Sequence, residues 1–334
     1  MIFGKASIYK MDSEKQKYIR KITYNVSENF EGKQLRDVLS SIGYSRNLLQ
    51  YLKNVQHIRL DTIVHANEEF TIEIEENEDS KNIKPVDIPI NIVYEDEDII
   101  VVNKQANLPT HPSLNNHDNT LGNALCYYFR NRNFVYRPIN RLDKGTSGLV
   151  IVAKNLLAGS LLSKAFINNF IRRTYTGIVS GNLYEVFMHD KNLVEKLKSE
   201  LEVENIIKAN DIYKHIKPRG IVEIPIKRET ESLIKRIPAE DGEYAKTTFF
   251  PLSYNKQNNT SFTKFILQTG RTHQIRVHML SLGHPIIGDF LYNPDYSLID
   301  RQALHAGEII FVHPITRKTM RFIAKTPDDI LKLI

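Results

Sequence analysis

The sequence has a single cysteine and no long hydrophobic run, and each shortage limits what the chain can be. Cys126 alone cannot build an internal disulfide framework or a multi-cysteine zinc site. No apolar run approaches the roughly 20 residues that a membrane-spanning helix needs. The N-terminal segment has no uninterrupted apolar core of the kind found in a signal peptide. We therefore expect a cytoplasmic protein that does not enter a membrane.

Motifs of metal-dependent and nucleotide-dependent proteins are also missing. The 11 histidines include no H-E-x-x-H pair, and His273 and His278 are five residues apart, which separates them on a helix. No G-x-x-x-x-G-K-[ST] loop is present, so nucleotide hydrolysis is not indicated, and no G-x-G-x-x-G follows a strand. We expect no metal site.

Charge is distributed unevenly along the chain. The 334 residues carry 45 basic and 39 acidic side chains, a net charge of +6. Residues 1–84 hold 13 of each sign, so residues 85–334 carry the whole basic excess. A basic body suits a polyanionic partner such as nucleic acid, although solubility alone also explains an excess of this size.

Hydrophobic periodicity indicates a small domain followed by a large one. Residues 32–55 place apolar side chains at helical spacing on both sides of Gly43 and Ser45, which predicts two short helices. Strands are predicted before them, at 21–31, and after them, in EEFTIEIEENED. The predicted boundaries are 1–26 for an N-terminal extension and first strand, 27–80 for a small α/β domain, 81–89 for a proline-containing linker and 90–334 for the large domain.

The large domain mixes strands and helices without regular alternation. Two apolar runs flank the acidic turn at 95–98 and predict a hairpin. The irregular order favours an α+β fold over a doubly wound parallel sheet. The charged segment at about 184–219 is expected to be a peripheral insertion. Further strands are predicted at 149–153, 173–181, 220–226, 245–253 and 261–268, and helices at 156–170 and 271–283.

Three stretches could carry chemistry. In NRLDKGTSG, residues 140–148, Asp143 is either a turn aspartate paired with a nearby arginine or a carboxylate held on a rigid loop as a nucleophile or base. In TGRTHQIRVHM, the basic residues either face solvent or hold a carboxylate and an anionic substrate. Tyr175, in RRTYTGIVSG, is either a core residue or a ring that stacks on substrate or passes a proton. The residue patterns alone leave these alternatives open.

These stretches, in this order, resemble the RluA family of RNA pseudouridine synthases. The likeness extends from about residue 88 to the C-terminus and includes NRLDKGTSGLVIVAKN, RRTYTGIVSG, LQTGRTHQIRVHMLSLGHPIIGDFLY and LHAGEIIFVHP. It implies a mixed, largely antiparallel sheet with a central cleft, and isomerisation of uridine in RNA without a metal or an organic cofactor. The target uridine would be flipped out of its stack, because an enzyme cannot reach the ring inside one.

The resemblance assigns roles to single residues. Asp143 matches the essential aspartate, Tyr175 the tyrosine that stacks on the target ring, and Arg276 the basic residue paired with the aspartate. Arg141 matches the arginine that fills the space of the flipped nucleotide, and Leu280 a leucine lining the uracil pocket. The other candidate RNA-binding residues are Asn140, which stands where the family usually has histidine, and Lys144, Arg271 and His273.

Residues 27–79 resemble a small RNA-binding domain shared with a small-subunit ribosomal protein, although its usual Val-x-Val-Asn-Gly stretch is absent.

A non-catalytic RNA-binding or ribosome-assembly protein with the same fold is the main alternative. Retention of the aspartate, tyrosine and arginine together argues against it. A carboxylate-based glycosidase would need a second acidic group that no motif supplies. We expect a monomer that acts on RNA, with ribosomal RNA favoured over transfer RNA.

Overall fold

The computed structural model forms two compact units that alternate along the chain. The first unit comprises Met1–Leu142, Leu149–Ile171 and Ile310–Arg321, and the second comprises Asp143–Gly148, Arg172–Ile309 and Phe322–Ile334. The residues that the structure describes are 6–7, 18–76, 79–113, 116–183 and 220–334. The insertion predicted at about 184–219 lies outside them.

The N-terminal part of the first unit is a small α/β arrangement. Strand β2 (Tyr18–Asn25) lies between β1 (Ala6–Ser7) and β3 (Glu69–Glu76), and both neighbours are antiparallel to it. A 3-10 turn at Glu28–Phe30 leads towards two helices, α1 (Leu35–Ser41) and α2 (Arg46–Asn54). Ser45 caps α2 by accepting the backbone N–H of Leu48 at 3.2 Å. The two short helices predicted here are therefore confirmed.

The rest of the first unit is a sheet with two helices. The predicted hairpin is confirmed, since β4 (Asn91–Glu95) pairs antiparallel with β5 (Ile99–Lys104). The strand order continues from β5 to β7, and β6 pairs antiparallel with β7. Leu157 of α4 belongs to the same hydrophobic core as the buried residues of α1 and α2. The other elements of this part are α3 (Leu121–Tyr128), β6 (Arg137–Pro138), β7 (Ser147–Ala153) and α4 (Leu156–Ile167).

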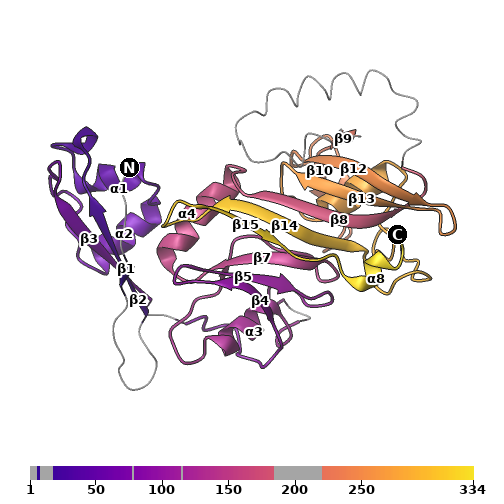
Figure 1. The fold of residues 1–334 in the computed structure, drawn as a ribbon, viewed down its shortest axis with the longest axis horizontal. Coiled ribbons are helices and arrows are strands. Elements are labelled where there is room, and N and C mark those ends of the chain that lie inside the picture. The colour runs from indigo at the N-terminus through magenta and orange to yellow at the C-terminus, as the bar shows by residue number, and fades with distance from the viewer. Residues whose placement is uncertain (1–5, 8–17, 77–78, 114–115, 184–219) are drawn as a thin grey trace. The chain divides into compact units, whose positions relative to one another are not determined.

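The second unit is built on a run of strands ordered β14, β8, β13, β12 and β9. Strands β8, β13, β12 and β9 are antiparallel neighbours, and Figure 1 shows β8, β13 and β12 side by side. Strand β14 pairs in parallel with the start of β7, through His305 and Ser147. The strands are β8 (Arg172–Ser180), β9 (Gly220–Glu223), β12 (Lys246–Asn255), β13 (Thr260–Leu267) and β14 (Leu304–Val312), with β15 (Thr319–Ile323) paired to β14.

Short elements complete the second unit. A hairpin of β10 (Ile226–Arg228) and β11 (Arg236–Pro238) contacts α7 (Gln274–Ser281), and α8 (Asp328–Leu331) lies near the C-terminus. None of the helices within the described ranges is long and apolar enough to cross a membrane. The mixed, largely antiparallel sheet confirms the α+β fold class. The domain boundaries and the central cleft stay predictions.

Candidate active site

The candidate catalytic carboxylate, Asp143, lies on a loop whose shape is fixed by hydrogen bonds within the loop and from residues 301 and 302. The backbone N–H of Thr146 donates to the carbonyl of Asp143 at 3.1 Å, which closes the turn. The Gln302 amide donates to the Thr146 hydroxyl at 2.5 Å, and the Arg301 guanidinium donates to the carbonyl of Gly145 at 3.3 Å. The Asp143 side chain is 21% exposed, so a substrate can reach a carboxylate that sits on a firmly held loop.

A glycine is required where this loop enters β7. Gly148 has φ +120°, which side chains with a Cβ rarely adopt. A Cβ at this position would also overlap the backbone of Ala306 on β14. The glycine thus lets the loop pass directly against the neighbouring strand.

Arg276 connects Asp143 to a second, fully buried carboxylate. Its Nη1 donates to Oδ2 of Asp143 at 2.9 Å. Its Nε and Nη2 donate to the two oxygens of Asp289 at 2.6 and 2.7 Å. The guanidinium is 1% exposed and Asp289 is buried completely. Burial by itself would lower the pKa of Arg276, but the hydrogen bonds to Asp289 and the nearby Asp143 charge raise it overall.

The loop of Asp289 holds that carboxylate in place. Oδ1 accepts the backbone N–H groups of Leu291 and Tyr292 at 3.0 and 3.2 Å. The Tyr292 ring also lies beside the arginine, with 5.0 Å between the ring centroid and the guanidinium carbon. Sequence reasoning missed Asp289 and Tyr292 as site residues, although both lie in the stretch GDFLY that helped to carry the family resemblance.

His273 lies at the start of α7 in an unusual backbone conformation. Its φ is +61°, in the left-handed region that residues other than glycine rarely occupy. Tyr292 donates its hydroxyl proton to the carbonyl of Arg236 at 3.0 Å. Nδ1 of His273 lies 3.0 Å from the Tyr292 hydroxyl oxygen and must therefore donate its proton to that hydroxyl. The Nε2 lone pair then faces Oδ2 of Asp143 at 3.9 Å.

Burial lowers the pKa of His273 to about 4, against the opposing influence of Asp143. The imidazole is thus neutral at pH 7, and its approach to Asp143 is not an ion pair. The predicted helix is corrected at this point, because α7 begins at Gln274 and not at Arg271. His273 therefore precedes the helix and does not share a helical face with Arg276.

Gln274 explains the shape of the loop before α7. Its Oε1 accepts the Thr269 hydroxyl at 2.6 Å and the Arg271 backbone N–H at 3.0 Å. Its Nε2 donates to the Lys246 carbonyl and the Thr247 hydroxyl, both at 2.9 Å. One buried amide thereby fixes the TGRTHQ loop to β12 and sets where α7 starts.

Tyr175 lies on β8, directly opposite Phe265 of β13. Its side chain is buried. Burial raises the pKa of Tyr175, Arg173 opposes that rise and the Asp143 charge adds to it. Tyr175 therefore keeps its proton at neutral pH. The structure therefore brings Asp143 and Arg276, which the sequence separates, into direct contact, and Tyr175 belongs to the same compact unit.

Comparison with known proteins decides the family. A model of the RNA pseudouridylate synthase family matches residues 98–281, more than half of the chain. The chain belongs to this family. The matched region contains the three residues just described, and an RNA pseudouridine synthase isomerises uridine in RNA. Family membership therefore supports an enzyme over a non-catalytic RNA-binding protein.

Individual relatives agree with this assignment. An uncharacterized RNA pseudouridine synthase of Bacillus subtilis, YjbO, is 30% identical over 310 residues, which cover 90% of this chain and 98% of YjbO. Ribosomal large subunit pseudouridine synthase D of Escherichia coli is 30% identical, with 94% and 93% of the two chains covered. Human RNA pseudouridylate synthase domain containing 1 shares the fold, with a TM-score of 0.52 at 22% identity, over 71% of this chain and 83% of its own.

The remaining candidate RNA-binding residues of this synthase lie in different surroundings. Arg141 and Lys144 are exposed. Asn140 is buried, and its amide donates to the Leu149 carbonyl at 3.0 Å and accepts the Ile151 N–H at 2.9 Å. Asn140 therefore holds β7 in place through its side chain.

Arg271 and Leu280 are both exposed. The Arg271 guanidinium donates to a carboxylate oxygen of Glu243 at 2.7 Å and to the Tyr244 carbonyl at 3.0 Å. Leu280 is 38% exposed and stands one helical turn beyond Arg276 on α7. Leu280 therefore presents an apolar side chain to solvent one helical turn from Arg276.

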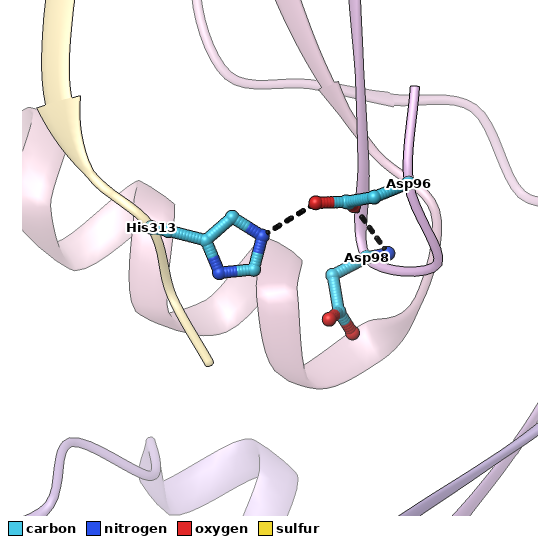
Figure 2. Close-up of side chains that lie close together, drawn as sticks. All are labelled: Asp96, Asp98 and His313. Atoms are coloured by element: carbon cyan, nitrogen blue, oxygen red, sulfur yellow. Dashed lines mark hydrogen bonds and ion pairs between the residues drawn. The ribbon is translucent and has the colours of Figure 1, made fainter. Parts of the chain in front are cut away.

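One cluster in the first unit has the residue types of a metal site. Within the described part of the chain, ligand atoms of Asp96, Asp98 and His313 lie within 4.8 Å of one another. Figure 2 shows the His313 ring facing Asp96. The distance from Nε2 of His313 to Oδ2 of Asp96 is 2.9 Å. Nδ1 of His313 accepts the backbone N–H groups of Ile315 and Thr316 at 3.2 and 3.0 Å. Nε2 must therefore carry the ring proton and donate it to Asp96.

Both carboxylates of this cluster are already occupied by other donors. Asp98 accepts two hydrogen bonds from the buried Arg20 at 2.8 Å, and Asp96 accepts the Tyr94 hydroxyl at 2.8 Å. Burial opposes ionisation of Asp96, but His313 and two backbone N–H groups lower its pKa overall. The arrangement is that of a hydrogen-bonded structural network.

Proposed function

We propose that Asp143, Tyr175 and Arg276 perform the isomerisation, and that the substrate is large-subunit ribosomal RNA. The single observation that carries the catalytic part is the 2.9 Å contact between Arg276 and Asp143. The substrate class is supported by relatives such as the E. coli protein, whose name specifies the large ribosomal subunit. A ribosomal RNA substrate would agree with the cytoplasmic location expected from the sequence.

The reaction needs an ionised carboxylate next to the ribose. The N1–C1′ bond breaks, the uracil turns, and C5 bonds to C1′; C5 then loses its proton and N1 gains one. Asp143 acts either as the nucleophile at C1′ or as the base that takes a ribose proton, and both roles require the charged form. The contact with Arg276 favours that form.

Tyr175 and Leu280 would shape the uracil pocket. Tyr175, whose side chain is buried, would provide the flat ring on which the flipped uracil stacks while it is detached. Leu280 adds apolar contact from the exposed side of α7. A pocket of this kind keeps water away from the broken glycosidic bond.

The proposed RNA contacts outside the pocket are basic. Arg141 and Lys144 flank Asp143 in sequence and are exposed, and Arg141 would fill the space of the flipped nucleotide. Arg271 and His273 would contact the RNA from the loop before α7. We leave Asn140 out of this set, because its amide is committed to the backbone of β7.

Tritium release tests the substrate class. Transcripts of large-subunit ribosomal RNA, small-subunit ribosomal RNA and transfer RNA, each labelled at uridine C5, would be incubated separately with the wild-type enzyme. We expect release from the large-subunit transcript. Release from transfer RNA alone would overturn the substrate assignment while leaving the chemistry intact.

A further inference from the structure

A half-exposed aromatic ring, Phe290, covers the arginine of the catalytic pair. The Phe290 ring centroid lies 5.3 Å from the guanidinium carbon of Arg276. Phe290 is 51% exposed, whereas Arg276 beneath it is 1% exposed. A large apolar ring therefore reaches solvent beside the side chain that holds Asp143.

The backbone around Phe290 is firmly held. Gly288 has φ +69°, and a Cβ there would overlap the carbonyl of Arg301. The preceding residue, Asp289, is anchored by Arg276, and its carbonyl accepts the N–H of Asn293 at 2.8 Å. The ring is thus presented by an ordered turn, and contact with the guanidinium orients it further.

An exposed ring in this place suits a nucleobase. Flipping a uridine out of its stack disrupts the stacking of both adjacent bases, and the Arg141 side chain proposed to fill the gap is not an aromatic ring. An aromatic side chain can replace the lost stacking partner, because every base offers a flat π surface. Tyr175 is buried and is already assigned to the target uracil, so a second, more exposed ring is free to serve a neighbour.

We propose that Phe290 stacks on a base next to the target uridine when the uridine is held at Asp143. This inference rests on the proposed function, since it requires an RNA substrate at that carboxylate. Phe290 would then contribute to RNA affinity and to the choice of neighbouring base, and not to the chemical step.

Steady-state kinetics give the first test. The modified uridine would be mapped with the wild-type enzyme, and a short RNA containing it would serve as substrate. We expect Phe290→Leu to raise KM roughly tenfold with kcat nearly unchanged, and Phe290→Tyr to restore KM, because a tyrosine ring also stacks. Tyr296, 47% exposed, supplies the matched control: Tyr296→Leu should keep the wild-type KM.

A fluorescence measurement separates stacking from mere packing on Arg276. 2-Aminopurine would be placed on either side of the target uridine, and binding followed in the Asp143→Asn background to prevent turnover. We expect quenching at one of the two positions, and its loss when Phe290→Leu is added. Unchanged KM with unchanged quenching, or a fall in kcat alone, would overturn the inference. Absence of turnover by the wild-type enzyme would overturn the proposed function and this inference with it.

Discussion

Arg276 works at this site through the geometry of its side chain. The Nε–Nη2 edge is occupied by Asp289, which leaves Nη1 to reach Asp143. A planar guanidinium can bind one carboxylate through two parallel N–H groups and still direct a third donor to another carboxylate, whereas a lysine ammonium has no planar pair of donors for the bidentate contact. Asp289 therefore acts as a positioning residue: it touches no reacting atom but determines where the arginine points.

Replacing Asp289 tests whether this carboxylate positions Arg276. In Asp289→Asn the arginine loses its ionised anchor, so we expect kcat to fall on the order of 100-fold through misplacement of Asp143. RNA affinity should stay near wild type. The buried pair is also broken, and the free energy of unfolding should fall by about 3 kcal/mol. Tritium release, RNA binding and urea denaturation would measure the three effects.

An exposed aspartate in the same region provides the control. Asp295→Asn removes an exposed carboxylate that accepts the Ser297 N–H at 2.9 Å. We expect wild-type kcat from this variant. Equal activity in Asp289→Asn and wild type would show that Arg276 needs no second carboxylate.

The catalytic loop and β7 form one element of the site, and Gly148 is the point at which they join. Gly148→Ala combines a left-handed backbone with overlap against Ala306, so we expect the free energy of unfolding to drop by roughly 3 kcal/mol or more. Gly283→Ala is the matched comparison, since its φ is +78° but nothing lies within 4 Å of the added Cβ. That variant should lose only about 1–2 kcal/mol. Similar losses in urea denaturation of the two would refute the packing argument.

Most regular elements near the site could be predicted from local pattern, and their exceptions have physical causes. Strands β7, β8, β12 and β13 lie within or close to the predicted ranges 149–153, 173–181, 245–253 and 261–268. The first residue of α7 could not be predicted from the sequence, because the basic and apolar pattern continues unbroken through it. The left-handed backbone of His273 and the hydrogen bond from the Arg271 N–H to the Gln274 amide set the helix start. The hairpin β10–β11 was also missed, since its short strands are mostly half-buried or exposed and carry no strong alternation.

Local sequence patterns cannot predict which distant residues meet at the site. Asp143 and Arg276 are 133 residues apart in the chain, and only the family resemblance predicted their pairing. Asp289 and Phe290 had no such prediction, because an aspartate and a phenylalanine in a turn are usual in any globular protein. Their importance follows from contact with Arg276, which no sequence pattern states.

At the scale of the whole molecule, buried histidines make stability depend on pH. Burial lowers the pKa of His273 and of His305 to about 4 in the folded protein, from 6.5. Both histidines therefore become protonated below about pH 6.5 in the unfolded chain, but only near pH 4 in the folded protein. Stability is present in full above pH 6.5 and is lost as pH falls towards 4, by up to about 3 kcal/mol for each histidine.

His305 provides the test of this dependence. Its Nδ1 contacts the Ser147 hydroxyl at 2.9 Å and its Nε2 faces the Ala324 carbonyl at 3.2 Å. We expect His305→Gln to lower stability at pH 7 but to reduce the loss between pH 7 and pH 5, as measured by urea denaturation. A variant with the wild-type pH slope would contradict the assignment.

We expect the Asp143 carboxylate to carry out the conversion of uridine to pseudouridine in RNA. The most direct measurement compares tritium release from C5-labelled large-subunit ribosomal RNA by the wild-type enzyme and by Asp143→Asn, with RNA binding measured in parallel. We predict release by the wild-type enzyme, none by the variant and similar binding by both, because the carboxylate acts in the chemical step. Equal release by the two proteins would contradict this role of Asp143.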